Sequence, residues 1–357
     1  MSRGGRRPTL AALAELPVAV DALGGDRAPS EVVAGARRAI DEHGIPVVLV
    51  GPPDRVGDVG DIELIACTEV IEMDEDAGQA VRRKKDSSLV RAAELVRDGK
   101  ASAMVSAGNT GATMAAALLR MGRLPGVARP CIATPLPRPG GPPAVLVDAG
   151  ANAECTSAML VQFAQMAAAY ASQRYGVADP SVALLSIGEE PTKGTQLVKE
   201  AHALLASGGG GLRFVGNVEG RDLLPCPADV VVTDGFTGNV ALKALEGSLR
   251  FLLDLLAKVF GTNAETREAA ETLMPHLLPI AAAVDPEMTG GAMLLGVDGV
   301  CVISHGSSTS VAIDNAIKVA RDLAVNGLVD HLAAAVSRPG AHGGQRAPAP
   351  APAVRGR

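Results

Sequence analysis

The chain has 357 residues, which is enough for one large domain or two smaller ones with a sizeable core. Hydrophobic residues make up 47% of it, aromatic residues only 2%, and there is no Trp, so the composition excludes an aromatic stacking surface for single-stranded nucleic acid. A net charge of −6 also argues against nucleic-acid binding. The five scattered cysteines favour buried thiols in a reducing cytoplasm over disulfides or a zinc site.

Predicted strands and helices alternate along most of the chain. Apolar runs at 18–20, 47–50 and 62–66 predict the first strands, and a helix is expected to begin near Pro29. This alternation is typical of an α/β fold with a largely parallel sheet, which we place at residues 17–335. Residues 1–16 are predicted to be a flexible leader without a secretory signal, and residues 336–357, rich in Pro, Ala, Gly and Arg, a disordered tail.

A run of four cations, unusual in an acidic protein, precedes a helix predicted to end near Asp98. It consists of Arg82, Arg83, Lys84 and Lys85. A solvated surface is one interpretation of such a run, and a contact for phosphate or for an acidic partner is the other.

Small polar turns follow several of the predicted strands. The first such turn contains Ser106, Gly108, Asn109, Thr110 and Gly111, and it leads directly into a helix. Glycines let a ligand approach the backbone closely, and a helix N-terminus offers free N–H groups to an anion. Similar turns follow the apolar runs that end near residues 147, 187, 233 and 303. Because open α/β sheets bind ligands beyond the carboxyl ends of their strands, these turns predict one ligand site.

The side chains in these turns suit an anionic ligand. Amides can donate to an oxyanion, a lysine supplies charge, and aspartates can orient their neighbours; the candidates are Lys193, Asn109, Asn152, Asn239, His305, Asp148, Asp234 and Ser307. Each also has a structural interpretation, as a turn residue, a helix cap or a structural histidine. Signatures for dinucleotides, P-loops, serine hydrolases and zinc are missing, so the sequence predicts no cofactor and no metal.

Residues 244–285 interrupt the alternation and predict two long helices with no strand between them. Leu249, Leu252, Leu253, Leu256 and Phe260 form an apolar stripe at helical spacing. Such a stripe is usually core or subunit interface, and docking onto a membrane surface is the alternative.

Eight segments together resemble the PlsX family of bacterial phosphate acyltransferases. They are VDALGGD at 20–26, AVRRKKDSS at 80–88, SAGNTGA at 106–112, DAGAN at 148–152, IGEEPTKG at 187–194, GNVEGRDL at 216–223, DGFTGNV at 234–240 and HGSS at 305–308. The resemblance covers about residues 17–335.

This resemblance implies an α/β/α sandwich like that of isocitrate and isopropylmalate dehydrogenases, which dimerises. It implies transfer of a fatty acyl group from acyl-carrier protein to orthophosphate, and peripheral association with the inner face of the cytoplasmic membrane. There a membrane-bound glycerol-3-phosphate acyltransferase would take the product. The helical pair at 244–285, expected to protrude, becomes the candidate for the membrane or dimer contact.

The implied reaction gives the candidate residues roles. We expect Lys193 to neutralise phosphate or the oxyanion, Asn239 to donate to it, and Asn109 with Thr110 to cradle phosphate. His305 would adjust the phosphate proton or protonate the departing thiolate, and the cationic run would contact the carrier protein. A short-chain phosphotransacetylase using acyl-CoA and a membrane-docked scaffold without turnover remain the alternatives.

Overall fold

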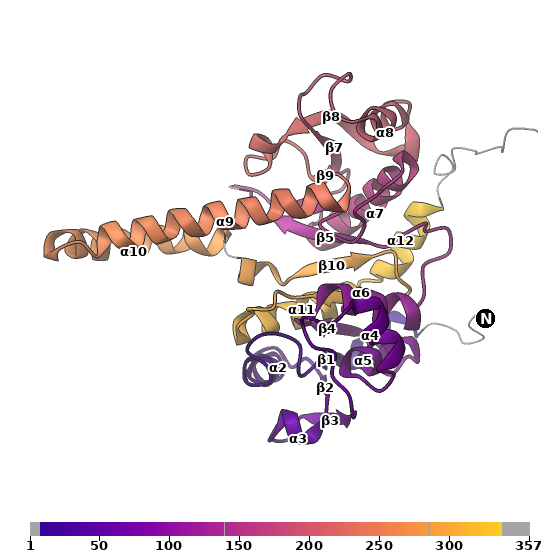
Figure 1. Cartoon of the computed structure of the whole chain (residues 1–357), viewed down its shortest axis with the longest axis vertical. Helices are drawn as coiled ribbons and strands as arrows, with labels where there is room; N and C mark the ends of the chain where they lie inside the picture. Colours follow the sequence, from indigo (N-terminus) through magenta and orange to yellow (C-terminus); the bar gives the residue numbers. More distant parts are fainter. Residues whose placement is uncertain (1–7, 139, 285, 338–357) are drawn as a thin grey trace, which may run out of the picture.

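The computed structural model describes residues 8–138, 140–284 and 286–337, and its strands form one sheet. Across the sheet the strands are β3 (Glu63–Ala66), β2 (Val47–Gly51), β1 (Val18–Asp21), β4 (Ala103–Ser106), β11 (Val300–Ile303), β10 (Ala292–Leu295), β5 (Cys131–Leu136), β6 (Ala144–Val147), β9 (Val230–Val232), β7 (Ser181–Ser186) and β8 (Arg213–Glu219). Helices cover both faces, so the predicted α/β/α sandwich is confirmed (Figure 1).

The helices divide between the two faces of the sheet. One face packs against α2 (Ser30–His43), α7 (Ser157–Tyr175), α8 (Gln196–Ala206), α11 (Ser310–Val325) and α12 (Leu328–Val336). The other packs against α4 (Ala77–Arg83), α5 (Ser88–Arg97), α6 (Thr110–Arg120) and the start of α9 (Gly235–Phe260). The remaining elements are α1 (Leu10–Glu15), α3 (Pro53–Val56), α10 (Ala264–Val284) and the short 3₁₀ turns Gly209–Gly211, Gly220–Asp222 and Pro286–Thr289.

Both faces of the central strands are buried, which is why these strands read as continuous apolar runs. In β1, Val18 and Val20 pack into the core on one face, and Ala19 packs into the core on the other. The same alternation occurs in β6, where Val145 and Leu146 belong to different cores.

The sheet changes direction near its centre. Strands β3, β2, β1, β4 and β11 are parallel to one another, as are β6, β9, β7 and β8. Between the two groups, β10 and β5 pair antiparallel with each other and with their outer neighbours β11 and β6. These three reversals leave the two parallel groups pointing in opposite directions, so their carboxyl ends lie at opposite edges of the sheet.

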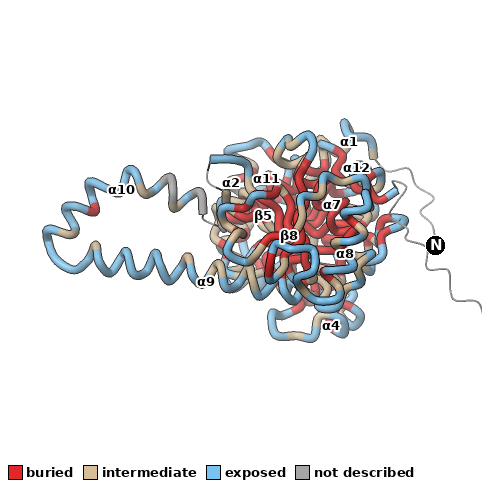
Figure 2. The backbone as a smooth tube through the Cα atoms, turned by 90° about the horizontal axis from the view of Figure 1, so that it is seen from above, coloured by how far each residue is buried: buried red, intermediate tan, exposed pale blue. Residues whose placement is uncertain are grey.

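Helices α9 and α10 form an arm that projects from the sandwich (Figure 2). α9 has 26 residues, which corresponds to about 39 Å. Its first turns pack on the sheet through Ala241, Leu242 and Leu245. Farther along, Leu252 and Leu256 are exposed, so the predicted apolar stripe does not enter the core of this chain.

Two sequence-based expectations concern the ends of the chain. The predicted flexible leader is wrong for Leu10–Glu15, which forms α1, and Arg321 of α11 donates to the carbonyl oxygen of Leu13 at 3.0 Å. The predicted disordered tail lies outside the described residues from 338 onward. Among the described helices, none combines the length and the apolar character needed to cross a bilayer.

We predict that Gly238→Ala lowers stability because α9 packs directly on the turn after β6. A Cβ atom at position 238 would lie 2.0 Å from the carbonyl oxygen of Asp148, so the helix must shift. The expected loss is about 1–3 kcal/mol, measured as the free energy of unfolding in urea. The matched control is Gly247→Ala on the same helix, where a Cβ meets nothing within 4 Å. The control should be neutral or stabilising, and equal stabilities of the two variants would contradict the packing argument.

Candidate active site

A buried turn at the carboxyl end of β4 holds two predicted site residues, Ser106 and Gly108. The Ser106 hydroxyl donates to Oδ2 of Asp21 at 2.7 Å and accepts from the backbone N–H of Gly108 at 3.0 Å. Burial raises the pKa of Asp21, and hydrogen bonds from Ser88 and Ser106 oppose that rise. Ser106 therefore shapes the turn, and Asp21, which the sequence analysis did not select, anchors it.

Asn109 caps α6, and its side-chain amide is hydrogen-bonded within the chain. Its Oδ1 accepts from the N–H of Ala112 at 3.0 Å, and its Nδ2 donates to the carbonyl oxygen of Met73 at 2.9 Å. The side-chain amide expected to cradle phosphate is thus occupied. The N–H groups of Thr110 and Gly111, in the first turn of α6, have no acceptor within the described residues. The backbone here, more than the Asn109 side chain, can meet an anion.

Asp148 organises the turn after β6. Its carboxylate accepts hydrogen bonds from the N–H groups of Ile132 (3.0 Å), Ala151 (2.9 Å) and Asn152 (2.8 Å), and from Nδ2 of Asn152 (2.8 Å). Burial raises the pKa of Asp148, and these hydrogen bonds oppose the rise. Nδ2 of Asn152 also donates to the carbonyl oxygen of Pro130 at 2.8 Å. Both side chains are therefore consumed in building the turn, and Asn152 has no amide hydrogen left for an oxyanion.

The first turn of α9 rests on that Asp148 turn. Asp234 caps the helix by accepting from the N–H of Thr237 at 2.8 Å, as its structural interpretation predicts. Nδ2 of Asn239 donates to the carbonyl oxygen of Ala149 at 3.2 Å. An amide nitrogen carries two hydrogens, so Asn239 keeps one for a ligand. Its exposed position at the start of α9 suits the predicted role.

Lys243, which the sequence analysis missed, connects α9 to the loop after β11, a strand of the other parallel group. His305 follows β11, and its Nε2 lies 3.4 Å from Nζ of Lys243. Lys243 also forms an ion pair with Glu246 at 2.8 Å. On the other side of the imidazole, Nδ1 lies 2.9 Å from the hydroxyl of Ser307. Lys243 stands one helical turn after Asn239, so α9 connects the loop after β6 to the loop after β11.

The apolar packing agrees with this connection. Ala149 and Ala151 of the Asp148 turn and Leu242 of α9 belong to the same hydrophobic cluster as Ala112 and Ala116 of α6. The N-terminal turns of α6 and α9 therefore cover the same face of the sheet, across which α9 runs between β9 and β10 (Figure 1).

Lys193 lies in the loop after β7 and is exposed. The loop is held by a hydrogen bond from Nδ2 of Asn217 to the carbonyl oxygen of Glu190 at 3.0 Å. Because β7 and β9 are parallel neighbours, this loop leaves the same edge of the sheet as the base of α9. The structure describes no contact between the Lys193 side chain and the other candidate residues.

The cationic run separates into two kinds of residue. Nζ of Lys84 turns inward, donating to the carbonyl oxygen of Val70 at 2.6 Å and pairing with Glu75, whose pKa this hydrogen bond lowers. Lys84 is therefore engaged within the chain, and the predicted carrier contact of the four cations remains a prediction. Three exposed cations remain as a basic patch, namely Arg82, Arg83 and Lys85.

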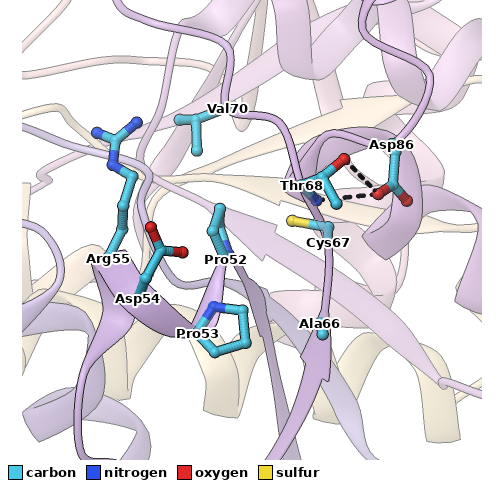
Figure 3. A pocket seen from close by; sticks show the side chains of 9 residues that line it. All are labelled: Pro52, Pro53, Asp54, Arg55, Ala66, Cys67, Thr68, Val70 and Asp86. Atoms are coloured by element: carbon cyan, nitrogen blue, oxygen red, sulfur yellow. Dashed lines mark hydrogen bonds between the residues drawn. The ribbon is translucent and has the colours of Figure 1, made fainter.

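A cavity of about 410 Å³ lies elsewhere, after β2 and β3 (Figure 3). None of the predicted site residues lines it. Cys67 points into it, and burial raises the pKa of that thiol to about 11, so it stays protonated at neutral pH. The hydroxyl of its neighbour Thr68 is engaged with Asp86 at 2.8 Å. These contacts offer neither a nucleophile nor a free cation for acyl transfer.

Comparison with known proteins assigns the chain to a family. Residues 16–331 match the family described as "Fatty acid synthesis protein". The phosphate acyltransferase of Desulfitobacterium hafniense (strain Y51) is 46% identical over 88% of this chain and 96% of its own length. The phosphate acyltransferase of Halothermothrix orenii is 43% identical over 90% of this chain and 99% of its own length.

Similarity to solved structures supports the fold alone. A phosphotransacetylase from Streptococcus pyogenes superposes with a TM-score of 0.58 at 18% identity, covering 88% of this chain and 97% of that one. The EutD phosphotransacetylase of Staphylococcus aureus gives a TM-score of 0.57 at 18% identity, covering 88% and 98%. With sequence motifs, family match and relatives in agreement over nearly the whole described chain, this protein belongs to the PlsX family of fatty acid synthesis proteins, the phosphate acyltransferases.

Proposed function

We propose that this enzyme transfers a fatty acyl group from acyl-[acyl-carrier protein] to orthophosphate, giving an acyl phosphate for phospholipid synthesis. The relatives named above support acyl transfer to phosphate. The observation that carries the proposal in this chain is the meeting of Asn239, Lys243 and His305 along the first turns of α9. The amide of Asn239 and the ammonium of Lys243 are hydrogen-bond donors, which suit an anionic acceptor and a carbonyl oxygen that gains charge.

Phosphate itself is the nucleophile in this reaction. One of its oxygens attacks the thioester carbonyl, the C–O bond forms, and the C–S bond breaks as the tetrahedral oxyanion collapses; the thiolate leaves and takes up a proton. No acyl-enzyme is needed. The cysteines agree with this route, because burial raises the pKa of Cys155 to about 11 and of Cys301 to about 12. At neutral pH these thiols are protonated and are poor nucleophiles.

A single assay tests the overall reaction. The purified protein is incubated with long-chain acyl-carrier protein, with and without orthophosphate, and acyl phosphate is trapped with hydroxylamine. We expect acyl hydroxamate and free carrier thiol only when phosphate is present. Product from acetyl-CoA but not from the carrier would instead support a phosphotransacetylase, and folded protein that is silent with both donors would support a scaffold.

Lys193 is proposed to neutralise charge on phosphate or on the oxyanion, because it is exposed and its loop leaves the same edge of the sheet as the base of α9, where Asn239 lies. In the hydroxamate assay we predict that Lys193→Ala lowers kcat/KM by about a hundredfold or more without changing the thermal unfolding midpoint. The matched control is Lys199→Ala, a lysine on α8 that is also exposed, which should retain full activity. Near-normal turnover in the Lys193 variant would remove this residue from the mechanism.

The basic patch is proposed to dock the acidic carrier protein. In a chain of net charge −6, long-range steering repels an acidic partner unless a local cationic surface overcomes it. The double change Arg82→Glu and Arg83→Glu should raise KM for the carrier-bound donor several-fold more than KM for acyl-CoA.

Reversing two other exposed cations, Lys100 and Lys199, controls for net charge and should spare both KM values. An equal rise for both donors in the patch variant would point to a phosphate contact instead.

The α9–α10 arm is proposed to touch the inner face of the cytoplasmic membrane, where a membrane-bound glycerol-3-phosphate acyltransferase would take the product. Along the arm Phe251, Leu252 and Val259 are 66%, 53% and 56% exposed. Burying these apolar side chains in an acyl layer or against a second copy of the chain removes apolar surface from water, which is favourable in free energy. We propose a homodimer as the working form.

The two uses of the arm can be separated. We predict that Phe251→Ser with Leu252→Ser abolishes flotation with anionic phospholipid vesicles and leaves the mass from light scattering unchanged. The control is Phe236→Ser, which alters an exposed aromatic residue at the base of the same helix and should float normally. A monomer from the double variant would assign these side chains to the dimer interface.

A further inference from the structure

Three large apolar side chains are exposed to water around the polar groups at the base of α9. Ile187, directly after β7, is 81% exposed, and Phe236 and Val240, in the first turns of α9, are 66% and 54% exposed. A single exposed apolar residue is common on a folded protein and needs no explanation, whereas a group of them beside polar groups marks a binding surface.

The sheet brings the loop that starts at Ile187 next to the first turn of α9. β7 and β9 are parallel neighbours, with Leu184 opposite Val232. Three residues beyond this pair, one strand has reached Ile187 and the other has reached Gly235, the first residue of α9. Because paired strands are about 4.8 Å apart, the chain at Ile187 leaves the sheet beside the start of the helix.

Phe236 and Val240 lie on one face of α9, because they are four residues apart. Asn239 follows Phe236 by three residues, and Lys243 follows Val240 by three residues. Residues at this spacing are also neighbours on a helix. The apolar side chains therefore alternate with hydrogen-bond donors along the first turns of α9.

Ile187 is in turn adjacent to Lys193. The Cγ atom of Lys193 lies 2.7 Å from the position that a Cβ atom would take on Gly188. The aliphatic part of the lysine therefore crosses the backbone directly after Ile187, and the glycine leaves the room for it. Each of the exposed apolar side chains thus lies beside a polar side chain to which the proposed reaction gives a role.

A fatty acyl thioester has the same arrangement of polar and apolar parts. Its carbonyl oxygen needs a hydrogen-bond donor when charge develops on it, and the methylene chain attached to that carbonyl is stabilised by leaving water. A membrane or a second protein seated on these side chains would also cover Lys193 and Asn239 and would keep phosphate out. An acyl chain, in contrast, arrives as part of the donor.

We propose that Ile187, Phe236 and Val240 bind the methylene groups next to the carbonyl of the acyl donor and make the enzyme selective for long acyl chains. This inference rests on the proposed function and adds the acyl-binding surface to it. Each methylene that leaves water contributes about fourfold to binding. The contribution should therefore rise with chain length until the chain extends beyond the three side chains.

The dependence of kcat/KM on chain length tests this surface. Wild type, Ile187→Ser and Val240→Ser are compared in the hydroxamate assay with butanoyl, octanoyl and hexadecanoyl carrier protein at saturating phosphate. We expect each serine variant to lower kcat/KM by about tenfold for the two longer donors and by less than about threefold for the butanoyl donor. KM for phosphate should stay unchanged.

Two further variants control for this experiment. Val215→Ser changes a valine that is 50% exposed near the start of β8, toward the opposite end of the parallel strands, and it should keep the wild-type dependence on chain length. Ile187→Leu keeps an apolar side chain of the same size and should also behave like the wild type. Circular dichroism verifies that each variant is folded.

The outcomes separate this inference from the function on which it rests. Equal losses with all three donors, or unchanged kcat/KM in both serine variants, would overturn the acyl contact and leave acyl transfer to phosphate in place. A changed mass in light scattering, or lost flotation with vesicles, would also overturn it and assign these side chains to a subunit or lipid contact. Wild type that makes no acyl phosphate from any of the three donors would overturn the proposed function itself.

Discussion

The antiparallel strands β10 and β5 are the constraint on which the site depends. They reverse the sheet at its centre, so the loops after β4 and β11 leave one edge and the loops after β6, β9 and β7 leave the other. Sheet twist of about 20–25° per strand turns the two groups toward each other over the five steps from β4 to β9. α9 completes the connection, because Asn239 contacts the turn after β6 and Lys243 reaches His305 after β11.

The base of α9 is accordingly the most firmly built part of the site. Asp148 gathers backbone N–H groups around a buried carboxylate, and Gly235 and Gly238 allow the helix to lie directly against that turn. This turn fixes Asn239, whose Nδ2 donates to the carbonyl oxygen of Ala149, and a donor that is held in place costs little reorganisation when charge develops on a bound oxyanion. The same helix continues into the exposed arm, which places the site and the proposed membrane contact on a single rigid element. A nascent acyl phosphate would thus be formed on the element that approaches the lipid surface.

The fold was largely predictable from the sequence because its buried strands are short apolar runs. The runs at 144–147 and 300–303 coincide with β6 and β11. The strands that reverse the sheet were missed. Residues 131–136 include Pro135 and are flanked by further prolines. Residues 292–295 form a run of only four residues, and a pair of glycines comes directly before it. Neither segment therefore has a clear strand pattern. Without these two strands, the sequence implied that all the ligand loops leave the same edge of the sheet.

Site residues were predictable by type but less so by role. Glycine-rich turns pointed to candidate loops, but side-chain amides in such turns can serve the backbone, as Asn109 and Asn152 do. Lys84 was indistinguishable from its neighbours, since only its packing shows the pair with Glu75. Lys243 carried no signal at all, because one lysine in an amphipathic helix usually faces solvent. Its partner His305 is 62 residues away in sequence.

The most direct test of this account is the position of phosphate in a crystal structure of the enzyme soaked with orthophosphate. We predict an ion at the base of α9, with an oxygen within hydrogen-bond distance of Nδ2 of Asn239. Density for phosphate in the cavity after β2 and β3, with the base of α9 vacant at saturating phosphate, would contradict it.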